Sequence, residues 1–287
     1  MYLSFSARAQ GDSHKEKDIP CQDAVFTYVD QKTGGLAIVA DGHGSEKHFR
    51  SDVGSALAVT VAHTTIVEFL HILNDGSMRR GAFDQRYTDE ITMMQEQLAQ
   101  LERTIITRWR SAVLQHFAAH PLSEREQALC TRENLTLTDE DAQVRVYGTT
   151  LIAALAHSKL WFVIQIGDGK CVVLDDEGTP YFPPELDDES LAGGQTTSLC
   201  DSDAAGHFRC DFGFERIKGI TVATDGVSDS FLPEEYLKLN ARLFADFLAN
   251  HKKAQKGVEQ SIAVWSTKGS RDDVSMAGVF YKNGLLE

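Results

Sequence analysis

Residues 36–44 read LAIVADGHG, an apolar run that ends in Asp41, Gly42, His43 and Gly44. Such a run predicts a buried strand, and the glycine after the aspartate allows a turn or a close backbone approach. The pattern recurs in 161–169, WFVIQIGDG, and in 219–226, GITVATDG. Singly, each Asp-Gly is typical of a hairpin turn, most clearly at Asp168. Together they predict that carboxylates from different strand ends converge.

The periodicity along the rest of the chain predicts an α+β layered domain. Helices are expected after Ser45 with Phe49 on the apolar face, from Ile91 towards Phe117, from Pro233, and over 258–265. The segment 34–35 is expected to be a hairpin turn, 149–174 an antiparallel meander, and 121–145 a loop with one short helix. Strands are expected over 24–30, 36–40, 149–156, 160–166, 171–174, 219–224 and 274–281.

Composition narrows the classes of partner. The 287 residues include 28 Lys and Arg against 42 Asp and Glu, a formal net charge of −14, which argues against nucleic acid. The five cysteines are odd in number and lack a CxxC spacing, so neither a disulfide framework nor a zinc knuckle is indicated. With no secretory signal and no apolar run near about 18 residues, we expect a soluble cytoplasmic protein that does not bind membranes.

Aspartates without a histidine and cysteine cluster favour Mg²⁺ or Mn²⁺ over zinc. Asp23 precedes the first hairpin, and Asp272 and Asp273 precede the last strand. A two-metal site lowers the pKa of a bridging water and stabilises charge in an in-line phosphoryl displacement. Such a site needs a proton donor for the leaving group, and His43 stands two residues after Asp41.

An ordered set of motifs resembles the metal-dependent Ser/Thr protein phosphatases of the type-2C family. The motifs run through nearly the whole chain, and the QDA and TTSLC (196–200) segments are most similar to a bacterial branch of that family. In chain order they are Cys21-Gln22-Asp23-Ala24, Asp41-Gly42-His43-Gly44, Gly148-Thr149-Thr150, Gly167-Asp168-Gly169-Lys170, Asp225-Gly226-Val227-Ser228-Asp229 and Arg271-Asp272-Asp273.

This resemblance implies one domain over 1–287 with an αββα four-layer fold, two antiparallel sheets flanked by helices. It implies hydrolysis of phosphoserine and phosphothreonine in proteins by a metal-bridging hydroxide, with His43 as general acid. Two Mn²⁺ or Mg²⁺ ions are implied, with a weaker third at Asp168 and Asp229. The implied ligands of the two core metals are Asp23, Asp41, the Gly42 carbonyl, Asp225 and Asp272.

The sequence departs from the family pattern at four places, two of which are Gln22 in place of the frequent Glu and Gly167-Asp168-Gly169-Lys170 in place of GDSR. His14 stands where an Arg usually grips the substrate phosphate, so the resemblance leaves His14, Lys15 or Lys17 for that role. Asp273 stands in place of the usual Asn, which leaves the choice of ligand between Asp272 and Asp273 open. The loop over 179–214 is interpreted either as a flap beside the site or as a surface excursion.

Other functions stay open at this point. A catalytically weak or inactive phosphoprotein-binding module is the alternative, motivated by the missing Arg. A two-metal hydrolase of small phosphate esters is another. A phosphatase implies a phosphorylated protein substrate, and a cognate Ser/Thr kinase is its expected counterpart.

Overall fold

Two five-stranded antiparallel sheets form the centre of the molecule. The structure is a computed structural model that describes residues 1–32, 34–74, 85–186 and 196–282. In spatial order, the first sheet contains β1 (Tyr2–Ala9), β10 (Val274–Tyr281), β9 (Gly219–Ala223), β6 (Lys170–Leu174) and β7 (Pro180–Tyr181). The second contains β2 (Ala24–Asp30), β3 (Gly34–Ala40), β4 (Leu151–Ala156), β5 (Trp161–Ile166) and β8 (Arg209–Gly213).

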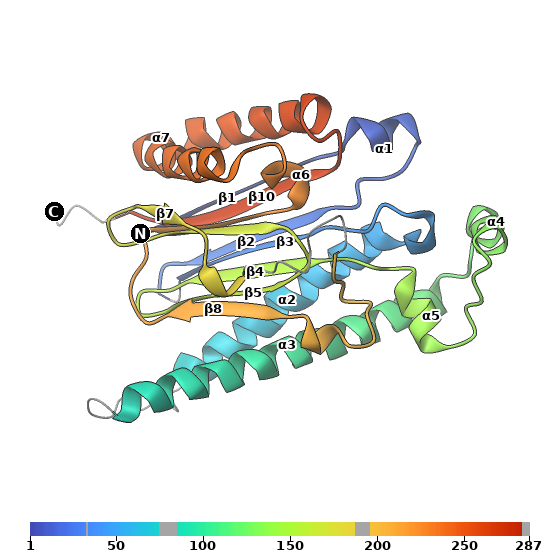
Figure 1. Cartoon of the computed structure of the whole chain (residues 1–287), viewed down its shortest axis with the longest axis horizontal. Coiled ribbons are helices and arrows are strands. Elements are labelled where there is room, and N and C mark those ends of the chain that lie inside the picture. The colour runs from blue at the N-terminus through green and yellow to red at the C-terminus, as the bar shows by residue number, and fades with distance from the viewer. Residues whose placement is uncertain (33, 75–84, 187–195, 283–287) are drawn as a thin grey trace.

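Long helices cover the outer face of each sheet, as Figure 1 shows. The helix α7 (Pro233–Lys268) lies over the first sheet, and α2 (Ser51–Asn74) with α3 (Gln85–Ala119) lies over the second. The expected αββα sandwich is therefore confirmed. The short helices are α1 (Asp12–Glu16), α4 (Glu124–Arg132), α5 (Glu140–Arg145) and α6 (Asp225–Ser228), with 3₁₀ turns η1 (Glu46–His48), η2 (Pro184–Leu186) and η4 (Ala204–Gly206).

The strand β3 shows why both sheet faces are apolar. Leu36 and Ile38 point into the core below α2, whereas Ala37 and Val39 point into the core between the sheets. Because side chains alternate along a strand, a strand covered on both faces reads as a continuous apolar run. That geometry explains the uninterrupted LAIVA sequence.

Several sequence expectations about connections were wrong. Gly34 and Gly35 lie inside β3, and the turn lies at Gln31 and Lys32, because Gly34 pairs with Asp30. The helix expected from Ser45 begins at Ser51, after η1. The segment 121–145 holds two helices, and 179–214 holds β7 and β8, although 187–195 of the expected flap lies outside the described residues. The strand β1 and the helix α1 had no prediction.

The expected meander over 149–174 is wrong in a way that matters for the site. The strands β4 and β5 pair in the second sheet, but β6 pairs with β9 in the first. Asp168 therefore lies in a crossing between sheets, not in a hairpin turn. Gly167 has a φ of +105°, a conformation that favours glycine, and allows this change of direction.

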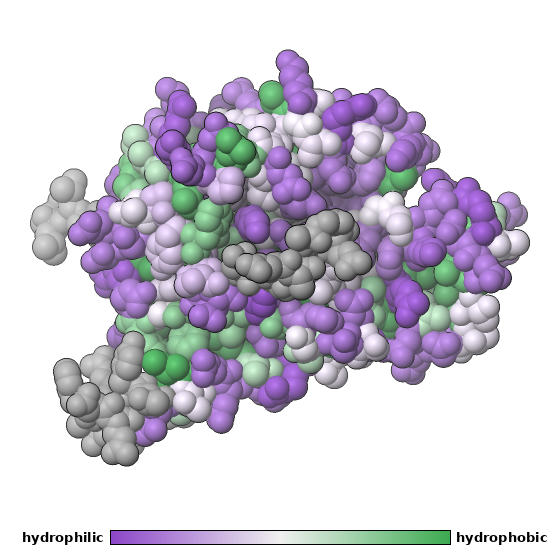
Figure 2. Space-filling model, in the orientation of Figure 1, coloured by the Kyte–Doolittle hydropathy of each residue, from purple (hydrophilic) through white to green (hydrophobic). Residues whose placement is uncertain are grey.

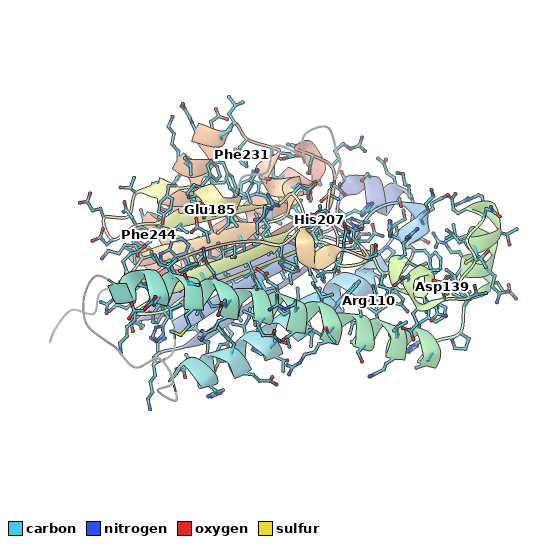
Figure 3. All side chains as sticks on the ribbon, turned by 60° about the horizontal axis from the view of Figure 1, so that its bottom comes forward. Arg110, Asp139, Glu185, His207, Phe231 and Phe244 are labelled. Atoms are coloured by element: carbon cyan, nitrogen blue, oxygen red, sulfur yellow. The ribbon has the colours of Figure 1, made fainter. Side chains whose placement is uncertain are left out.

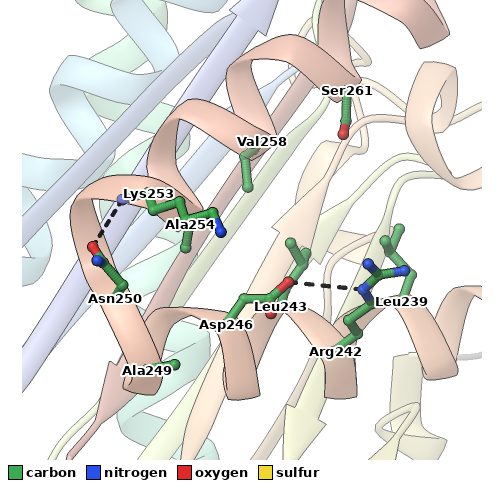
Figure 4. Close-up of a pocket in the computed structure, with 11 residues that line it drawn as sticks. Leu239, Arg242, Leu243, Asp246, Ala249, Asn250, Lys253, Ala254, Val258 and Ser261 are labelled. Carbon is green, nitrogen blue, oxygen red and sulfur yellow. Dashed lines mark hydrogen bonds and ion pairs between the residues drawn. The ribbon is translucent and has the colours of Figure 1, made fainter.

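The helix α7 joins the two helices expected from Pro233 and over 258–265. It is bent at Asn250, whose φ of −157° and ψ of 92° are not helical. Figure 4 shows the Asn250 side chain at the bend, where its Oδ1 accepts a hydrogen bond from the Lys253 amide at 3.1 Å. This bond caps the second arm of the helix, as Asn does at a helix start.

The helix α2 is more apolar than the sequence analysis allowed. Among the described helices, its residues Ser51–His71 are long and apolar enough, with a mean hydropathy of 1.5, to cross a membrane by length and composition. The expectation that no segment is long and apolar enough to span a membrane was therefore wrong by length and composition. Ala58, Ala62 and Ile66 are fully buried in the core against the second sheet, and core packing accounts for the composition.

The visible face in Figure 2 is largely hydrophilic.

Arg50, just before α2, holds the helix α4 against the rest of the protein. Its side chain is buried and donates to Glu126 at 2.5 and 3.1 Å and to the Tyr147 hydroxyl at 2.9 Å. The backbone amide of Arg50 also donates to the Val146 carbonyl. A buried charge with two carboxylate contacts is costly to leave unpaired.

We predict that Arg50→Met lowers the free energy of unfolding by about 3 to 5 kcal/mol, because Glu126 loses its buried partner. Arg110, labelled in Figure 3, supplies a control: it forms an ion pair from α3 with the exposed Asp141. Arg110→Met is expected to cost less than about 1 kcal/mol. Urea unfolding of the two variants measures both values, and equal losses would contradict the prediction.

Candidate metal centre

The register of the strands brings the predicted carboxylates to one edge of the sandwich. Ala24 pairs with Ala40 in the second sheet, so Asp23 and Asp41 lie side by side beyond the ends of β2 and β3. Ala223 pairs with Met276 and with Lys170 in the first sheet. Near this end of the first sheet, Asp168 precedes Lys170, Asp225 follows Ala223, and Asp272 and Asp273 precede Met276. These four aspartates therefore lie at the same edge.

The backbone of Asp41 is fixed by the Gly148-Thr149-Thr150 motif. The carbonyl of Asp41 accepts hydrogen bonds from the Thr150 amide and the Thr149 hydroxyl, both at 2.8 Å. The Asp41 amide donates to the Thr150 hydroxyl at 3.0 Å. These bonds hold the residue rigidly at the end of β3, so its carboxylate has a defined direction.

The residue after Asp41 must be glycine for a steric reason. A Cβ on Gly42 would lie 2.6 Å from the Gln22 carbonyl oxygen and 2.7 Å from that of Ser51. No side chain fits between these two carbonyls. The Gly42 amide donates to the Gln22 carbonyl at 3.2 Å, which ties the Asp41 loop to the Asp23 loop.

The carboxylates repel one another strongly. Burial, and then the charge of Asp273, raises the pKa of Asp23 to about 8. Burial, and then the charges of Asp23 and Asp225, raises the pKa of Asp41 well above its usual value. The pKa of Asp225 rises to about 6 through burial, despite a hydrogen bond with Asp41, and the charges of Asp168, Asp229 and Asp272 contribute.

Two further aspartates stand at the side of this group. Burial, and then the charge of Asp168, raises the pKa of Asp229, which ends α6. The turn that carries Asp168 is held by the Gly167 amide, which donates to the Thr197 hydroxyl at 3.0 Å. In the next residue, the Ser198 hydroxyl donates to the Thr149 carbonyl at 3.1 Å. The TTSLC segment thus connects the Asp168 turn to the Asp41 loop.

The donor set fits a divalent cation. The Oδ2 of Asp23 accepts from the Thr224 hydroxyl at 2.9 Å, whereas its buried Oδ1 has no hydrogen-bond partner. An ion would neutralise the mutual repulsion and satisfy this oxygen. Within the described residues, no three Asp, Glu, His or Cys side chains already close around one point. The carboxylates share an edge but are not drawn together into a coordination sphere.

His43 lies next to this edge on the Gly148 side. Its amide donates to the Gly148 carbonyl at 3.0 Å, and its ring centroid lies 4.9 Å from that of His48. Burial, and then the positive charge that His48 can carry, lowers the pKa of His43 to about 4. The His48 ring is fixed in turn at the Arg145 carbonyl, 2.5 Å from its Nδ1.

The three residues considered for the substrate phosphate have different environments. His14 is buried, with its Nδ1 2.9 Å from Oδ2 of Asp273. Lys15 is exposed and pairs with Asp12 at 3.1 Å, and Lys17 is exposed at the end of α1. A phosphate role for them stays a prediction.

Asp273 has a structural role that the sequence analysis missed. Its carboxylate accepts from the amides of Gly11 and Gln22, at 2.8 and 2.6 Å, in addition to the contact with His14. Its side chain is 3% exposed, whereas that of Asp272 is 57% exposed. The Asp272 side chain is therefore exposed at the edge, where its Oδ1 accepts from the Asp273 amide at 2.8 Å, whereas the Asp273 carboxylate is enclosed by its own donors. The Asp-Asp doublet alone did not distinguish the two.

Comparisons with known proteins give a family from one search and a fold from another. The family model described as protein phosphatase 2C matches residues 10–265. No curated protein sequence matches the chain.

Several solved structures with a similar fold are Ser/Thr phosphatases. The Ser/Thr phosphatase PstP/Ppp of Mycobacterium tuberculosis is 16% identical, with a TM-score of 0.53, over 98% of this chain and 99% of that one. The catalytic domain of PstP in complex with two manganese ions is 16% identical, with a TM-score of 0.51, over 98% of this chain and 97% of that one. The Ser/Thr phosphatase Stp1 of Staphylococcus aureus is 14% identical, with a TM-score of 0.53, over 99% of this chain and 96% of that one.

The raised pKa values predict how metal and pH affect stability. Asp23 and Asp225 bind protons more tightly in the folded protein than in the unfolded chain, so metal-free stability falls as pH rises from about 4 to 8. Mn²⁺ at about 100 times its dissociation constant should raise the melting temperature at pH 8 by at least about 5 °C. The rise should be smaller at pH 5, where protons compete for the carboxylates.

Thermal melts with EDTA or Mn²⁺ at both pH values measure these shifts. Asp246→Asn, an exposed change on α7, should leave the metal-induced shift unchanged. An equal shift at pH 5 and pH 8 would contradict metal binding by the buried carboxylates.

Proposed function

The chain belongs to the protein phosphatase 2C family, and from that premise we propose that it hydrolyses phosphoserine and phosphothreonine in proteins with divalent metal ions. The observation that carries this proposal is the group of carboxylates at one edge of the sandwich, where burial and then the charges of neighbouring aspartates raise the pKa values of Asp23, Asp41 and Asp225. Such an arrangement is unfavourable without a counter-cation, and it suits oxygen-ligated Mn²⁺ or Mg²⁺.

The residues that would hold two ions come from four different connections. Manganese is the favoured cofactor, since the PstP catalytic domain of similar fold is described with two manganese ions. Asp168 and Asp229, with their own mutual repulsion, are the candidates for a third ion. The proposed ligands of the first two are Asp23, Asp41, the Gly42 carbonyl, Asp225 and Asp272.

When bound, these ions supply a water of lowered pKa and polarise the phosphoryl group of the substrate. His43 is proposed to donate a proton to the serine or threonine oxygen that leaves. The Gly148 carbonyl fixes the His43 backbone, and the close His48 ring restricts the imidazole. A substrate phosphate beside His43 would favour its protonated form, against the burial that lowers its pKa.

The proposal implies a phosphorylated protein as substrate, and a Ser/Thr kinase as the enzyme that produces it. None of the contacts in the described residues favours a non-catalytic binding module over an enzyme. The alternative is therefore kept as an outcome of the activity test.

We predict that the protein releases phosphate from a phosphothreonine peptide in the presence of Mn²⁺. Asp225→Asn should lower kcat/KM roughly a thousandfold or more, because a bound divalent ion contributes several kcal/mol to transition-state stabilisation. Asp246→Asn on α7 is the matched control and should keep full activity. A malachite-green assay of released phosphate, with and without EDTA, measures these rates.

Three results would count against the proposed site or activity. Full activity of Asp225→Asn would contradict the metal centre. Phosphopeptide binding without any phosphate release would indicate the binding module. Faster turnover of nucleotides or sugar phosphates than of phosphopeptides would contradict a protein substrate.

We further predict that His43→Gln lowers kcat by about 10²- to 10⁴-fold, the usual contribution of general acid catalysis. The metal affinity should change little, because His43 is not a proposed ligand. His207→Gln, a change of a partly exposed histidine paired with Asp203, should have no effect on either quantity. Steady-state kinetics measures kcat, and calorimetric titration with Mn²⁺ measures the metal affinity. A large loss of metal affinity in His43→Gln would contradict the assignment of His43 as general acid.

A further inference from the structure

Two of the departures from the family pattern are in direct contact. His14 replaces the usual Arg near the start of the chain, and Asp273 replaces the usual Asn near its end. Although 259 residues separate them, the Nδ1 of His14 lies 2.9 Å from Oδ2 of Asp273. Both side chains are more than nine-tenths buried. The two changes therefore form one unit, a buried imidazole supported by a carboxylate.

Asp273 fixes the orientation of this imidazole. Its Oδ1 accepts from the Gly11 amide and its Oδ2 from the Gln22 amide, so the carboxylate cannot rotate without losing both bonds. The short helix α1 is also held at the other side, because the Ser13 amide donates to the Arg271 carbonyl at 3.1 Å. Since a carboxylate only accepts hydrogen bonds, Nδ1 of His14 is the donor in this pair.

The opposite nitrogen of His14 is directed at the metal centre. Its Nε2 lies 3.7 Å from Oδ1 of Asp272. A Cβ built on Gly44 would lie 3.6 Å from this Nε2 and 3.7 Å from Oε1 of Gln22, so both atoms face the Asp41-Gly42-His43-Gly44 loop. The Oε1 of Gln22 is buried without a hydrogen-bond partner. The unpartnered Oε1 of Gln22 and the Nε2 of His14 thus face the same loop beside Asp272.

We propose that His14 is a nitrogen ligand, through Nε2, of the divalent ion that Asp272 holds. This inference rests on the metal centre of the proposed function. Two ligands of one octahedral ion with bonds of about 2.1 Å lie about 3.0 Å apart when adjacent and about 4.2 Å apart when opposite. The separation of 3.7 Å between Nε2 and Oδ1 falls between these values, and a small movement of the exposed Asp272 side chain reaches the adjacent arrangement.

The carboxylate behind the imidazole supports this assignment over a phosphate-binding role. A metal-ligating histidine usually donates its other N–H to a carboxylate or carbonyl, which orients the ring and makes the ligating nitrogen more basic. His14 and Asp273 reproduce that arrangement. An Arg grips phosphate with a planar fork of donors, which a buried imidazole bonded to Asp273 does not offer.

The charge count also favours a neutral ligand. The four proposed carboxylate ligands, those of Asp23, Asp41, Asp225 and Asp272, balance two divalent cations. An imidazole adds a donor atom without adding negative charge to a group whose repulsion is already large. It also changes metal preference, because imidazole suits transition metals whereas Mg²⁺ prefers oxygen. His14 should therefore favour Mn²⁺ over Mg²⁺.

Pulsed electron paramagnetic resonance of the Mn²⁺-loaded full chain tests the proposal without an activity readout. The wild-type protein should show a coupling from directly bound ¹⁴N, which ¹⁵N-histidine labelling converts into a ¹⁵N coupling. His14→Gln should lose the coupling, and the control His207→Gln should keep it. If His14→Gln does not fold, the coupling in the folded variant His43→Gln/His48→Gln assigns the nitrogen, because His43 lies in the Asp41 loop and its ring contacts that of His48.

Each outcome decides the proposal. Bound Mn²⁺ with couplings from oxygen ligands only would overturn it while leaving the phosphatase proposal intact. A nitrogen coupling that survives in His14→Gln, or disappears in His43→Gln/His48→Gln, would assign another histidine and overturn it. Failure of the chain to bind Mn²⁺ at all would overturn both proposals. Weaker binding of inorganic phosphate by His14→Gln, without a nitrogen coupling in the wild type, would indicate the phosphate role instead.

Calorimetric titrations give a second, independent readout. Asp273→Asn keeps an acceptor for Nδ1 of His14 but loses the charge, and should weaken Mn²⁺ binding about 10- to 100-fold. The ratio of Mn²⁺ to Mg²⁺ affinity should fall in His14→Gln and stay unchanged in His207→Gln. An unchanged ratio in a folded His14→Gln would contradict a nitrogen ligand.

Discussion

Repulsion among buried and half-buried carboxylates is the constraint that governs the rest of this molecule. Burial raises the pKa values of Asp23, Asp41 and Asp225, and the charges of aspartates in the neighbouring loops raise them further. A chain free to relax would move them into solvent. The surrounding hydrogen bonds prevent this: the Asp41 carbonyl is held by Thr149 and Thr150, and the Asp23 carboxylate by Thr224. The fold thus keeps the charges together for a cation to neutralise.

The double sheet explains how rigid the edge is. Each sheet is covered by helices on its outer face and by the other sheet on its inner face. The strands β3, β9 and β10, which end or begin at the metal centre, are therefore buried along nearly their whole length. The crossing from β5 to β6 links the sheets at this edge and places Asp168 there. The Thr197 hydroxyl accepts from the Gly167 amide in this crossing, and the Ser198 hydroxyl donates to the Thr149 carbonyl before β4. These two neighbouring residues therefore connect the crossing to the second sheet. Movement of one loop is therefore resisted by contacts from both sheets.

The sequence predicted what depends on local pattern and missed what depends on long-range contact. Apolar runs gave β3, β4, β5 and β9, because strands buried on both faces leave an unmistakable pattern. The short helix α1 gave no signal, since its position depends on Asp273 at the far end of the chain. Asp168 was predicted in a hairpin turn because strands that are adjacent in sequence usually pair. The pairing of β6 with β9, in the other sheet, shows that the prediction was wrong. The aspartates of the site were visible as strand ends, but the separate roles of Asp272 and Asp273 depend on burial, which the doublet cannot reveal.

The contact between His14 and Asp273 changes how the departures from the family pattern are understood. Taken one by one, the loss of an Arg and the gain of a carboxylate both suggest a weakened phosphate site. In contact, they compensate each other: the imidazole gains a fixed orientation, and the added carboxylate gains three donors that offset its burial. A site in decay would be expected to lose ligands singly, without such a match. The pairing is better explained by a centre whose ligand set has been modified while the carboxylates of its edge were kept.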